Sequence, residues 1–535
     1  MTSESLPESV SSQELLAALS QPGFYPHPVP GGVEVIQTHI SLVFLAGARV
    51  YKVKKALDLG FLDYSTLERR RACCEAEVTL NRRLAPEVYL EVAAITREPA
   101  GGLALAGAGE VVDYAVVMLR LPAERTFKAL VARGELTAEH VQQLAALLAR
   151  FHRGAARSAR IAAFGGFEVV AANCRENFTQ LEPFLDDTIH PSVHRRLRAL
   201  TEAELEAQRA ALAERERQQA PCDCHGDLRL EHVYALEHEG RSRLVAVDCI
   251  EFNERFRYGD PVGDLAFPVM ELMRAGREDL ARLLAEGYFA ASEDEGRALL
   301  PLYVAYRAVV RGKVRSFMAA QSGVEPQARR AAQDRARGHF LFALGLLGRV
   351  ELRPCLALVG GLPASGKSTL ARGLHAHGFV WVRADAVRKE LAGLEASESA
   401  SADFGAGLYT PAWSERTYAA CLERAREALF AGRRVVVDAS FSRAADRARF
   451  LEASRRWGVA PRLLLCEAPP EAVRSRMARR AQEPGPSDAD WRVYEGMAAR
   501  WEPLTPDVER ITTRLDTRLA PEATLEAALA ALAAR

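Results

Sequence analysis

A glycine-rich loop in the last third of the chain has the residue types that bind the phosphates of a nucleotide. The stretch GLPASGKS is a complete G-x-x-x-x-G-K-S (Walker A) sequence behind the apolar run CLALVG. Gly361 and Gly366 let backbone N–H groups face a polyphosphate, and Lys367 reaches the β- and γ-phosphates. Ser368 ligates Mg²⁺, and Thr369 follows it in a helix whose positive end faces the same anion. We therefore expect this P-loop to bind ATP with Mg²⁺, with GTP as the alternative nucleotide.

An aspartate and an arginine behind the next apolar run could complete a phosphoryl-transfer site. Asp385 lies eighteen residues after Lys367, just past the run FVWV, where a parallel strand would end beside the γ-phosphate. There it can accept the proton of an acceptor hydroxyl. Arg388, one helical turn further on, can clamp an anionic group. The alternative for Asp385 is a structural role as the N-cap of a helix that begins with AVRKEL.

A second pair of aspartates lies in the first half of the chain. Asp227 follows His225 and Gly226 after an apolar segment, and Asp248 ends the apolar run LVAVD. Phosphoryl transfer needs one acid to orient or deprotonate the acceptor hydroxyl and a second acid to hold Mg²⁺ on the phosphates. Two aspartates at loop ends, each beside an apolar segment, supply such a pair.

The residues around Asp227 resemble the aminoglycoside phosphotransferase branch of the protein-kinase-like fold, whose catalytic loop reads H-G-D-x-x-x-x-N. The resemblance extends over about residues 30–345, because LAALLARFH at 144–152 and GDPVGDLA at 259–266 resemble further segments of that family. It implies that Asp227 is the catalytic aspartate and that Asp248 binds the metal.

The same resemblance implies an ion pair that holds the nucleotide phosphates. Val50-Tyr51-Lys52 resembles the strand that carries the phosphate-binding lysine of the family. Glu77 in the next helix is the expected partner of Lys52, with Glu75 as the rival. The alternative interpretation is that the lysines at 52, 54 and 55 form a solvated strand end.

Two departures from the family pattern concern the metal and the nucleotide. His232 stands at the position of the metal-binding Asn; imidazole still binds metals, but it is softer than an amide oxygen and favours Mn²⁺ over Mg²⁺. The alternative is that His232 packs behind the loop and bonds a backbone carbonyl. The turn THIS at 38–41 also lacks a G-x-G-x-x-G sequence. A non-catalytic kinase fold, in which Asp227 and Asp248 only stabilise the loop, is therefore the alternative to an active domain.

The last third of the chain resembles the small P-loop kinases: polynucleotide 5′-kinase, chloramphenicol phosphotransferase, gluconate kinase and the zeta-toxin group. This resemblance implies that Asp385 is the base and that Asp438, at the end of VVVD, supports the Mg²⁺ shell. It also implies an arginine-bearing lid over the triphosphate at EAVRSRMARRAQ, with Arg474, Arg476, Arg479 and Arg480 as its cations. The alternative for this run is a solvated basic helix.

The elements that must position these residues differ between the two parts of the chain. In the first part, strands expected at VEVIQT, LVFLA, RVYKVKK and VVDYAVVMLRL combine with long helices, as in an α+β protein-kinase-like domain. In the second part, expected strands at 355–359, 379–382, 434–438 and 463–466 alternate with helices, as in an α/β P-loop NTPase domain with a parallel sheet. We therefore predict an N-terminal extension at 1–30, a kinase-like domain at 31–350 and a P-loop kinase domain at 351–535.

Composition restricts the partners and the compartment. Of 535 residues, 70 are Lys or Arg and 70 are Asp or Glu, so no net field recruits nucleic acid or an anionic membrane. No run approaches the ~20 apolar residues of a membrane span, and the polar, acidic start MTSESLPESVSSQELL does not fit a signal peptide. The nine scattered cysteines indicate reduced thiols, so we expect a cytoplasmic protein.

Together these features predict an ATP-dependent phosphotransferase with two nucleotide-binding domains that transfers the γ-phosphate to an alcohol group of a small molecule. The tandem order resembles bacterial fusions of an aminoglycoside phosphotransferase with an ATP-binding protein. Two alternatives stay open: a nucleotide-binding regulatory protein with an N-terminal pseudokinase, and a kinase of nucleic-acid ends in the C-terminal domain. The expected partners are the nucleotide and its acceptor, without a membrane, and the balanced charge disfavours nucleic acid.

Overall fold

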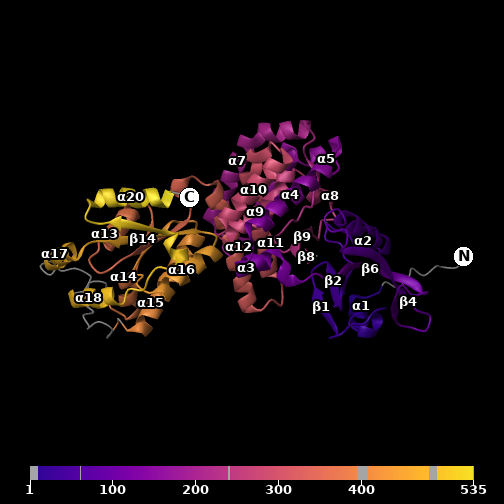
Figure 1. Cartoon of the computed structure of the whole chain (residues 1–535), viewed down its shortest axis with the longest axis horizontal. Coiled ribbons are helices and arrows are strands. Elements are labelled where there is room, and N and C mark those ends of the chain that lie inside the picture. Colours follow the sequence, from indigo (N-terminus) through magenta and orange to yellow (C-terminus); the bar gives the residue numbers. More distant parts are fainter. Residues whose placement is uncertain are drawn as a thin grey trace. The chain divides into compact units, whose positions relative to one another are not determined.

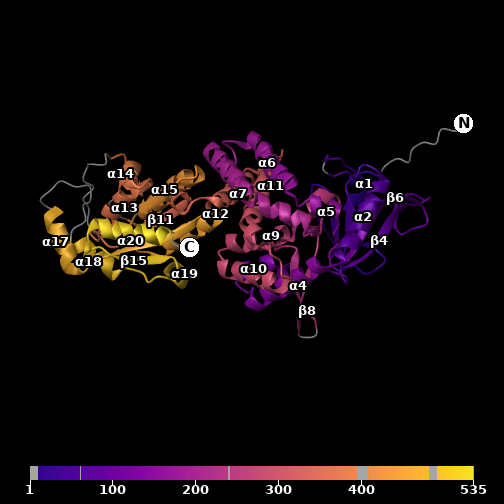
Figure 2. The same ribbon diagram turned by 90° about the horizontal axis from the view of Figure 1, so that it is seen from above.

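The computed structural model describes residues 10–60, 62–238, 241–394, 408, 410–480 and 491–533 (Figures 1 and 2). The chain forms two compact units: residues up to 170 together with 208–303, and residues 171–207 together with 304–535. The chain passes from one unit to the other within three helices, which are α6 (Phe167–Leu181), α7 (Pro191–Arg217) and α11 (Leu300–Ala320).

The first unit contains a six-stranded antiparallel sheet in the order β1-β2-β3-β6-β4-β5. Its strands are β1 (Val33–Gln37), β2 (Ser41–Ala46), β3 (Arg49–Lys54), β4 (Tyr89–Arg97), β5 (Leu103–Leu105) and β6 (Glu110–Leu119). On one face, Tyr51 and Val53 of β3 form a core with Leu15 and Leu19 of α1 (Ser12–Leu19). Because side chains alternate along a strand, the residues between them face the other side, where α2 (Leu67–Asn81) packs on β4 and β6.

Short strands and helices complete the first unit. β7 (Cys222–Asp223) pairs with β10 (Tyr258–Gly259), and β8 (Val233–His238) pairs with β9 (Arg241–Ala246). Both α4 (Ala138–Gly154) and α9 (Pro261–Arg274) pack against α10 (Glu278–Ser292). The remaining elements are α3 (Phe127–Arg133), α5 (Ala159–Ala163), α8 (Glu254–Arg257) and the 3₁₀ helices Pro22–Phe24, Ala123–Arg125 and Gly296–Leu299. The loops after β7 and β9 carry the two aspartates of the predicted N-terminal site.

The second unit contains a five-stranded parallel sheet in the order β12-β13-β11-β14-β15. Its strands are β11 (Cys355–Gly360), β12 (Val380–Arg383), β13 (Val435–Asp438), β14 (Ala460–Glu467) and β15 (Thr512–Asp516). On one face, α13 (Lys367–Ala376) packs with α20 (Pro521–Ala533) over a core that includes Leu370, Leu464 and Leu515. The order places β11, which leads into the P-loop, at the centre of the sheet.

Other helices of the second unit border this sheet. α15 (Pro411–Phe430) contacts β11, β12 and β13, α16 (Ala444–Arg456) contacts β14, and α12 (Pro326–Leu347) packs on both helices. The remaining elements are α14 (Ala384–Leu391), α17 (Pro470–Arg480), α18 (Trp491–Ala499), α19 (Pro506–Glu509) and the 3₁₀ helices Glu182–Phe184 and Val350–Leu352. None of the helices in the described ranges is long and apolar enough to cross a bilayer.

The predicted fold class is confirmed, with a kinase-like α+β arrangement first and a parallel α/β sheet second. The expected strands correspond to β1, β2, β3, β6 and β11–β14, and short strands were also expected around the loop where β7, β8 and β9 lie, whereas β4, β5 and β15 were not predicted. The predicted domain limits stay a prediction. α1 lies in the predicted extension at 1–30 yet packs into the core of the first unit, and α12 groups with the P-loop part although it precedes residue 351.

Candidate nucleotide and phosphotransfer sites

In the first unit, β3 and α2 bring a lysine and a glutamate to the aspartate that follows β9. Lys52 Nζ donates to Glu77 Oε1 and to Asp248 Oδ1, each at 2.9 Å. Glu77 is fully buried, whereas Glu75 pairs with an arginine one turn earlier on the exposed side of α2. The structure therefore pairs Lys52 with the expected partner, and the rival Glu75 lies elsewhere.

The charges of this cluster fix its ionisation. The pKa of Asp248 is lowered, first by the charge of Lys52, while burial acts in the opposite direction. Burial lowers the pKa of Lys52, but the charges of Asp248 and Glu77 outweigh it and raise the pKa well above its usual range. Both groups are therefore charged at neutral pH, as the binding of metal and phosphates requires.

A second lysine of β3 belongs to the same cluster and was not predicted as a site residue. Lys54 is 1% exposed, and its Nζ donates to Glu77 Oε2 at 2.7 Å and also to Glu251 Oε1. Tyr64 donates to the same oxygen of Glu251 at 2.7 Å. Glu77 thus bridges Lys52 and Lys54. The signal in the sequence was the spacing of two residues, which puts both lysines on one face of a strand.

The loop that carries Asp227 is held by a carboxylate at the start of α9. Asp264 accepts the backbone N–H groups of His225 at 2.6 Å and of Gly226 at 2.8 Å. His225 Nε2 donates to the carbonyl of Val247 at 3.0 Å and ties this loop to the one that carries the second aspartate. Gly226 has a φ of 87°, and a Cβ there would lie 2.7 Å from a backbone oxygen, so only glycine fits. These contacts fix the position of the next residue, Asp227.

His232 bonds a backbone carbonyl and also faces the predicted metal ligand. Its Nδ1 donates to the carbonyl of Asp227 at 2.8 Å, which leaves the lone pair on Nε2. Nε2 lies 3.5 Å from Asp248 Oδ2 and accepts a hydrogen bond from Arg229 Nη2 at 2.8 Å. This tautomer and donor set fit a divalent metal held by His232 and Asp248, on condition that Arg229 releases the ring.

Arg229 is a residue of this site that the sequence reasoning missed. Its Nε donates to Asp227 Oδ2 at 2.9 Å, and its other nitrogens bond Glu231 and His232. The guanidinium therefore lies against the carboxylate predicted to act on the acceptor. The signal in the sequence was an arginine two positions after the predicted catalytic aspartate, where a cation can neutralise phosphate charge.

In the second unit, the P-loop connects β11 to α13. Gly361 and Gly366 have φ values of 139° and 97°, in the left-handed region. A Cβ at Gly361 would lie 2.5 Å from a backbone oxygen of β14, so the loop passes this strand so closely only because it has glycine there. Lys367 Nζ donates to a backbone oxygen of the loop at 2.6 Å, and Ser368 and Thr369 lie in the first turn of α13. This geometry fits the predicted anion-binding loop, and the binding itself stays a prediction.

Asp438 ends β13 beside this loop. Its pKa is raised, first by burial, while the charge of Lys367 and a hydrogen bond from Ser368 act to lower it. Asp438 Oδ2 is buried and has no hydrogen-bond partner within the part of the chain that the structure describes. A buried carboxylate oxygen without a partner, next to the hydroxyl of Ser368, fits a Mg²⁺ ion, which takes oxygen ligands.

Asp385 and Arg388 lie one turn apart on α14. Arg388 Nη1 donates to Asp385 Oδ1 at 3.0 Å. The charge of Asp385 also contributes to raising the pKa of Asp438, so the two carboxylates are close enough to interact. α14 begins at Ala384 with Arg383 as its N-cap, so Asp385 is the second residue of the helix and not its cap. The structure thus favours the chemical interpretation of Asp385 over the capping alternative.

The arginines of the predicted lid differ in their surroundings. Arg476 Nη1 donates to a backbone oxygen of the P-loop and to Thr517 Oγ1, each at 3.2 Å. Arg474 lies over an indole ring of α18 at 4.1 Å from its centroid, and Arg479 is exposed on α17. The side chain of Arg480 lies outside the described residues. Only Arg476 therefore contacts the nucleotide-binding loop directly among those described, and the lid role of the group stays a prediction.

Two family descriptions match the chain. The Phosphotransferase enzyme family matches residues 63–303, and the AAA domain matches residues 356–504. The first match contains Asp227 and Asp248, and the second contains the P-loop with Asp385 and Asp438. Both domain types are nucleotide-binding and of kinase type.

Relatives and solved structures are similar to the chain over different lengths. A choline/ethanolamine kinase family protein from Mesorhizobium loti is 16% identical, covers 63% of this chain and 95% of its own, and has a TM-score of 0.39. A gluconokinase from Sinorhizobium meliloti 1021 is 22% identical, covers 34% of this chain and 92% of its own, and has a TM-score of 0.25. Uncharacterised proteins of Mycobacterium tuberculosis strain H37Rv and of Mycobacterium bovis are each 32% identical over 480 residues, which cover 89% of this chain and 91% of theirs. The mycobacterial match therefore extends across both parts of the chain.

Proposed function

The chain belongs to one family with these mycobacterial proteins and joins two nucleotide-binding domains of kinase type, and on this premise we propose that it transfers the γ-phosphate of ATP to a hydroxyl group of a small molecule. The observation that carries the proposal is that each nucleotide site holds two carboxylates in different surroundings. A site that only binds a nucleotide needs an acid for the metal. A second acid beside the phosphates serves a transferred hydroxyl group.

In the P-loop domain the two acids have separate neighbours. Asp438 is buried and accepts from Ser368, so it suits the metal. The side chain of Asp385 is 32% exposed and pairs with Arg388 at 3.0 Å, so solvent and an acceptor can reach it. Because the two carboxylates have different surroundings, Asp438 suits metal binding and Asp385 suits proton transfer.

The reaction proposed at this site balances without another reactant. The acceptor oxygen forms a bond to the γ-phosphorus while the bond from that phosphorus to the β,γ-bridging oxygen breaks, and ADP leaves. Asp385 takes the hydroxyl proton, Lys367 neutralises charge on the phosphates, and Arg388 orients Asp385. Bound Mg²⁺ supplies further charge neutralisation at the phosphate oxygens.

The test is acceptor-stimulated release of ADP by the full chain, screened with sugars, antibiotics, nucleosides and RNA ends. We expect Asp385→Asn to lower stimulated ADP release by ~100-fold or more while ATP affinity stays within about threefold, because the carboxylate acts on the acceptor and not on the nucleotide. Asp334→Asn, on the exposed side of α12, is the matched control and should behave like the parent. Stimulated release that Asp385→Asn leaves intact would refute the proposed base.

The second candidate function is that the N-terminal domain binds a nucleotide and regulates the protein without transferring phosphate. The observation that favours it is the hydrogen bond from Arg229 to His232 Nε2, because it occupies the lone pair that a metal ion would need. In an Asp385→Asn background, any remaining stimulated turnover that Asp227→Asn abolishes assigns chemistry to this domain. Nucleotide binding by this domain without such turnover favours the regulatory role. Asp279→Asn on α10 is the control for Asp227→Asn.

A further inference from the structure

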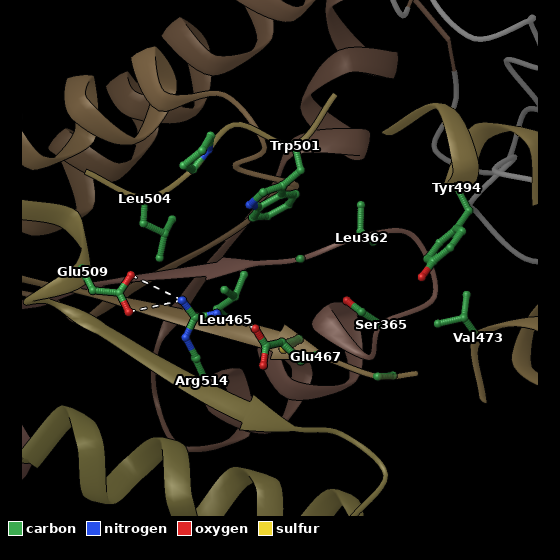
Figure 3. A pocket seen from close by; sticks show the side chains of 14 residues that line it. Leu362, Ser365, Leu465, Glu467, Val473, Tyr494, Trp501, Leu504, Glu509 and Arg514 are labelled. Carbon is green, nitrogen blue, oxygen red and sulfur yellow. Dashed lines mark hydrogen bonds and ion pairs between the residues drawn. The ribbon is translucent and has the colours of Figure 1, made fainter. Parts of the chain in front are cut away.

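A cavity of about 480 Å³ opens beside the start of the P-loop (Figure 3). Gly361, Leu362 and Ser365 line one side of it, and the end of β14 lines the next. The rings of Tyr494 of α18 and Trp501 of the following segment line the cavity, and in Figure 3 Leu362 is seen between them. The cavity shares Gly361 with the phosphate-binding loop, but Lys367, Ser368 and Asp438 are not among the residues that line it.

The cavity lies on the face of the sheet that is turned away from α13. Leu464 of β14 and Leu515 of β15 belong to the core under α13 and α20. Side chains alternate along a strand, so Leu465 and Arg514, which line the cavity, point to the opposite face. The triphosphate is held at the N-terminus of α13, and the space on the other face is therefore available to a different molecule.

The cavity contains a buried polar group that has no partner. Ser365 is 2% exposed, and its Oγ has no hydrogen-bond partner among the residues described. Figure 3 shows the hydroxyl directed into the cavity. Buried hydroxyl groups are nearly always hydrogen-bonded, so an unpaired one that lines a cavity indicates a ligand with a polar group.

The walls of the cavity restrict the size and charge of that ligand. At about 30 Å³ for each water-sized group, the volume holds about sixteen such groups, which suits a molecule of one or two rings. Tyr494 is 8% exposed and, with Trp501 and Leu504, gives the cavity an aromatic and aliphatic side. Opposite it, Arg514 pairs with Glu467 at 2.7 Å and with Glu509 at 3.2 Å, so two carboxylates surround one cation. The excess negative charge disfavours an anionic ligand.

The cavity also borders the P-loop beside its lysine. Lys367 Nζ donates to the carbonyl of Leu362 at 2.6 Å, so the ammonium that binds the β- and γ-phosphates touches the residue that forms the cavity rim. We propose that this cavity holds the body of the acceptor of the P-loop domain, and that the acceptor is a neutral or cationic alcohol of one or two rings. This inference rests on the proposed phosphotransfer.

The test uses three probes that share one ring and differ in charge: 2-(4-hydroxyphenyl)ethanol, tyramine and 4-hydroxyphenylacetate. Their binding to the full chain is measured by saturation-transfer NMR and by titration. We expect the neutral and cationic probes to bind at least fivefold more tightly than the anionic probe. Leu504→Trp fills the cavity and should weaken probe binding at least tenfold, whereas Leu352→Trp, at a side chain that is 56% exposed, should leave it within twofold.

A second variant keeps the test decisive if Leu504→Trp does not fold. Glu467→Gln removes one of the two carboxylates without changing the shape of the side chain. The preference for tyramine over 4-hydroxyphenylacetate should fall at least threefold, while the affinity for Mg²⁺–ATP stays within twofold. An unchanged preference would overturn the assignment of the charged side of the cavity.

Three results would overturn the proposal. The first is that no probe binds the parent protein, and the second is that Leu504→Trp folds and binds the probes like the parent. The third is that ATP displaces the probes competitively, because this result would assign the cavity to the nucleoside of ATP. A failure here is distinct from a failure of the proposed function. Lost probe binding leaves Asp385-dependent ADP release intact, whereas stimulated release that Asp385→Asn leaves unchanged refutes phosphotransfer by the P-loop domain, whatever the probes do.

Discussion

His232 is the residue at which this chain departs from the H-G-D-x-x-x-x-N catalytic loop, and its two nitrogens have separate roles. Nδ1 donates to the carbonyl of Asp227, which fixes the tautomer and places the lone pair on Nε2. Nε2 then lies 3.5 Å from Asp248 Oδ2 and accepts from Arg229. A metal ligand and a hydrogen-bond acceptor need the same lone pair, so Arg229 and a metal compete for it.

Replacing His232 by asparagine tests whether His232 Nε2 binds a metal ion or accepts a hydrogen bond from Arg229. If Nε2 binds the metal, His232→Asn exchanges a softer imidazole nitrogen for a harder amide oxygen and lowers the preference for Mn²⁺ over Mg²⁺. We expect the ratio of the nucleotide affinities measured with the two metals to shift toward Mg²⁺ by roughly fivefold or more. The measurement is a titration of nucleotide in a Lys367→Ala background, which silences the P-loop site. His190→Asn, at an exposed histidine, is the control. An unchanged ratio would mean that His232 does not bind the metal and only stabilises the loop through its bond to the carbonyl of Asp227.

At the level of elements, the sequence predicted most of the strands that carry apolar runs and missed β15, which carries none. β11, β13 and β14 are buried through most of their length, and their runs of Val, Leu and Ala made them visible. β15 is an edge strand in which Leu515 is the single buried residue, so no apolar run marked it. Arg476 was expected over the triphosphate, but its bonds to Thr517 depend on the loop after this unpredicted strand.

The sequence predicted those site residues that lie within one motif. It did not predict the contacts between residues that are far apart in the chain. The P-loop and the H-G-D loop each carry their chemistry in consecutive residues, and the structure brings them to the expected strand ends. Lys54 and Glu251 are 197 positions apart in the sequence, and only the packing of β3 beside the loop after β9 joins them. Spacing alone placed Lys54 on the same face as Lys52, but it could not tell a buried lysine from a solvated one.

The cluster around Lys54 predicts how strongly β3, α2 and the loop after β9 depend on one another. Lys54→Met leaves Glu251 without its cation in a buried position, so we expect the free energy of unfolding to fall by about 3–5 kcal/mol. Lys54→Met combined with Glu251→Met should recover about 2 kcal/mol of that loss, because no unpaired charge remains. Urea unfolding of the full chain measures both values. Lys55→Met changes the adjacent, more exposed lysine and should alter stability by no more than about 0.5 kcal/mol. Equal effects at Lys54 and Lys55 would contradict the buried network.

At the level of the whole chain, two nucleotide sites are built on unrelated architectures. The N-terminal site takes its lysine from an antiparallel strand and its acids from two loops, whereas the P-loop site takes its lysine from the N-terminus of a helix and its acids from the ends of parallel strands. Each has its own hydrophobic core. The two sites share no assigned residue, so a single substitution should abolish nucleotide binding at one site and leave binding at the other unchanged.

The number of nucleotides bound by one chain tests this independence. With a non-hydrolysable ATP analogue and Mg²⁺, isothermal titration calorimetry of the parent should give two sites. Lys367→Ala removes a charge-assisted contact to the phosphates and should cost at least ~2 kcal/mol, or about 30-fold in affinity, at one site only. Asp248→Asn should remove the other site, because the metal loses a charged ligand there and Lys52 loses one of its two carboxylate partners. The double variant should bind at neither site, and Lys55→Met should keep both. A parent that binds one nucleotide, or a single substitution that abolishes both sites, would show that the two domains do not bind independently.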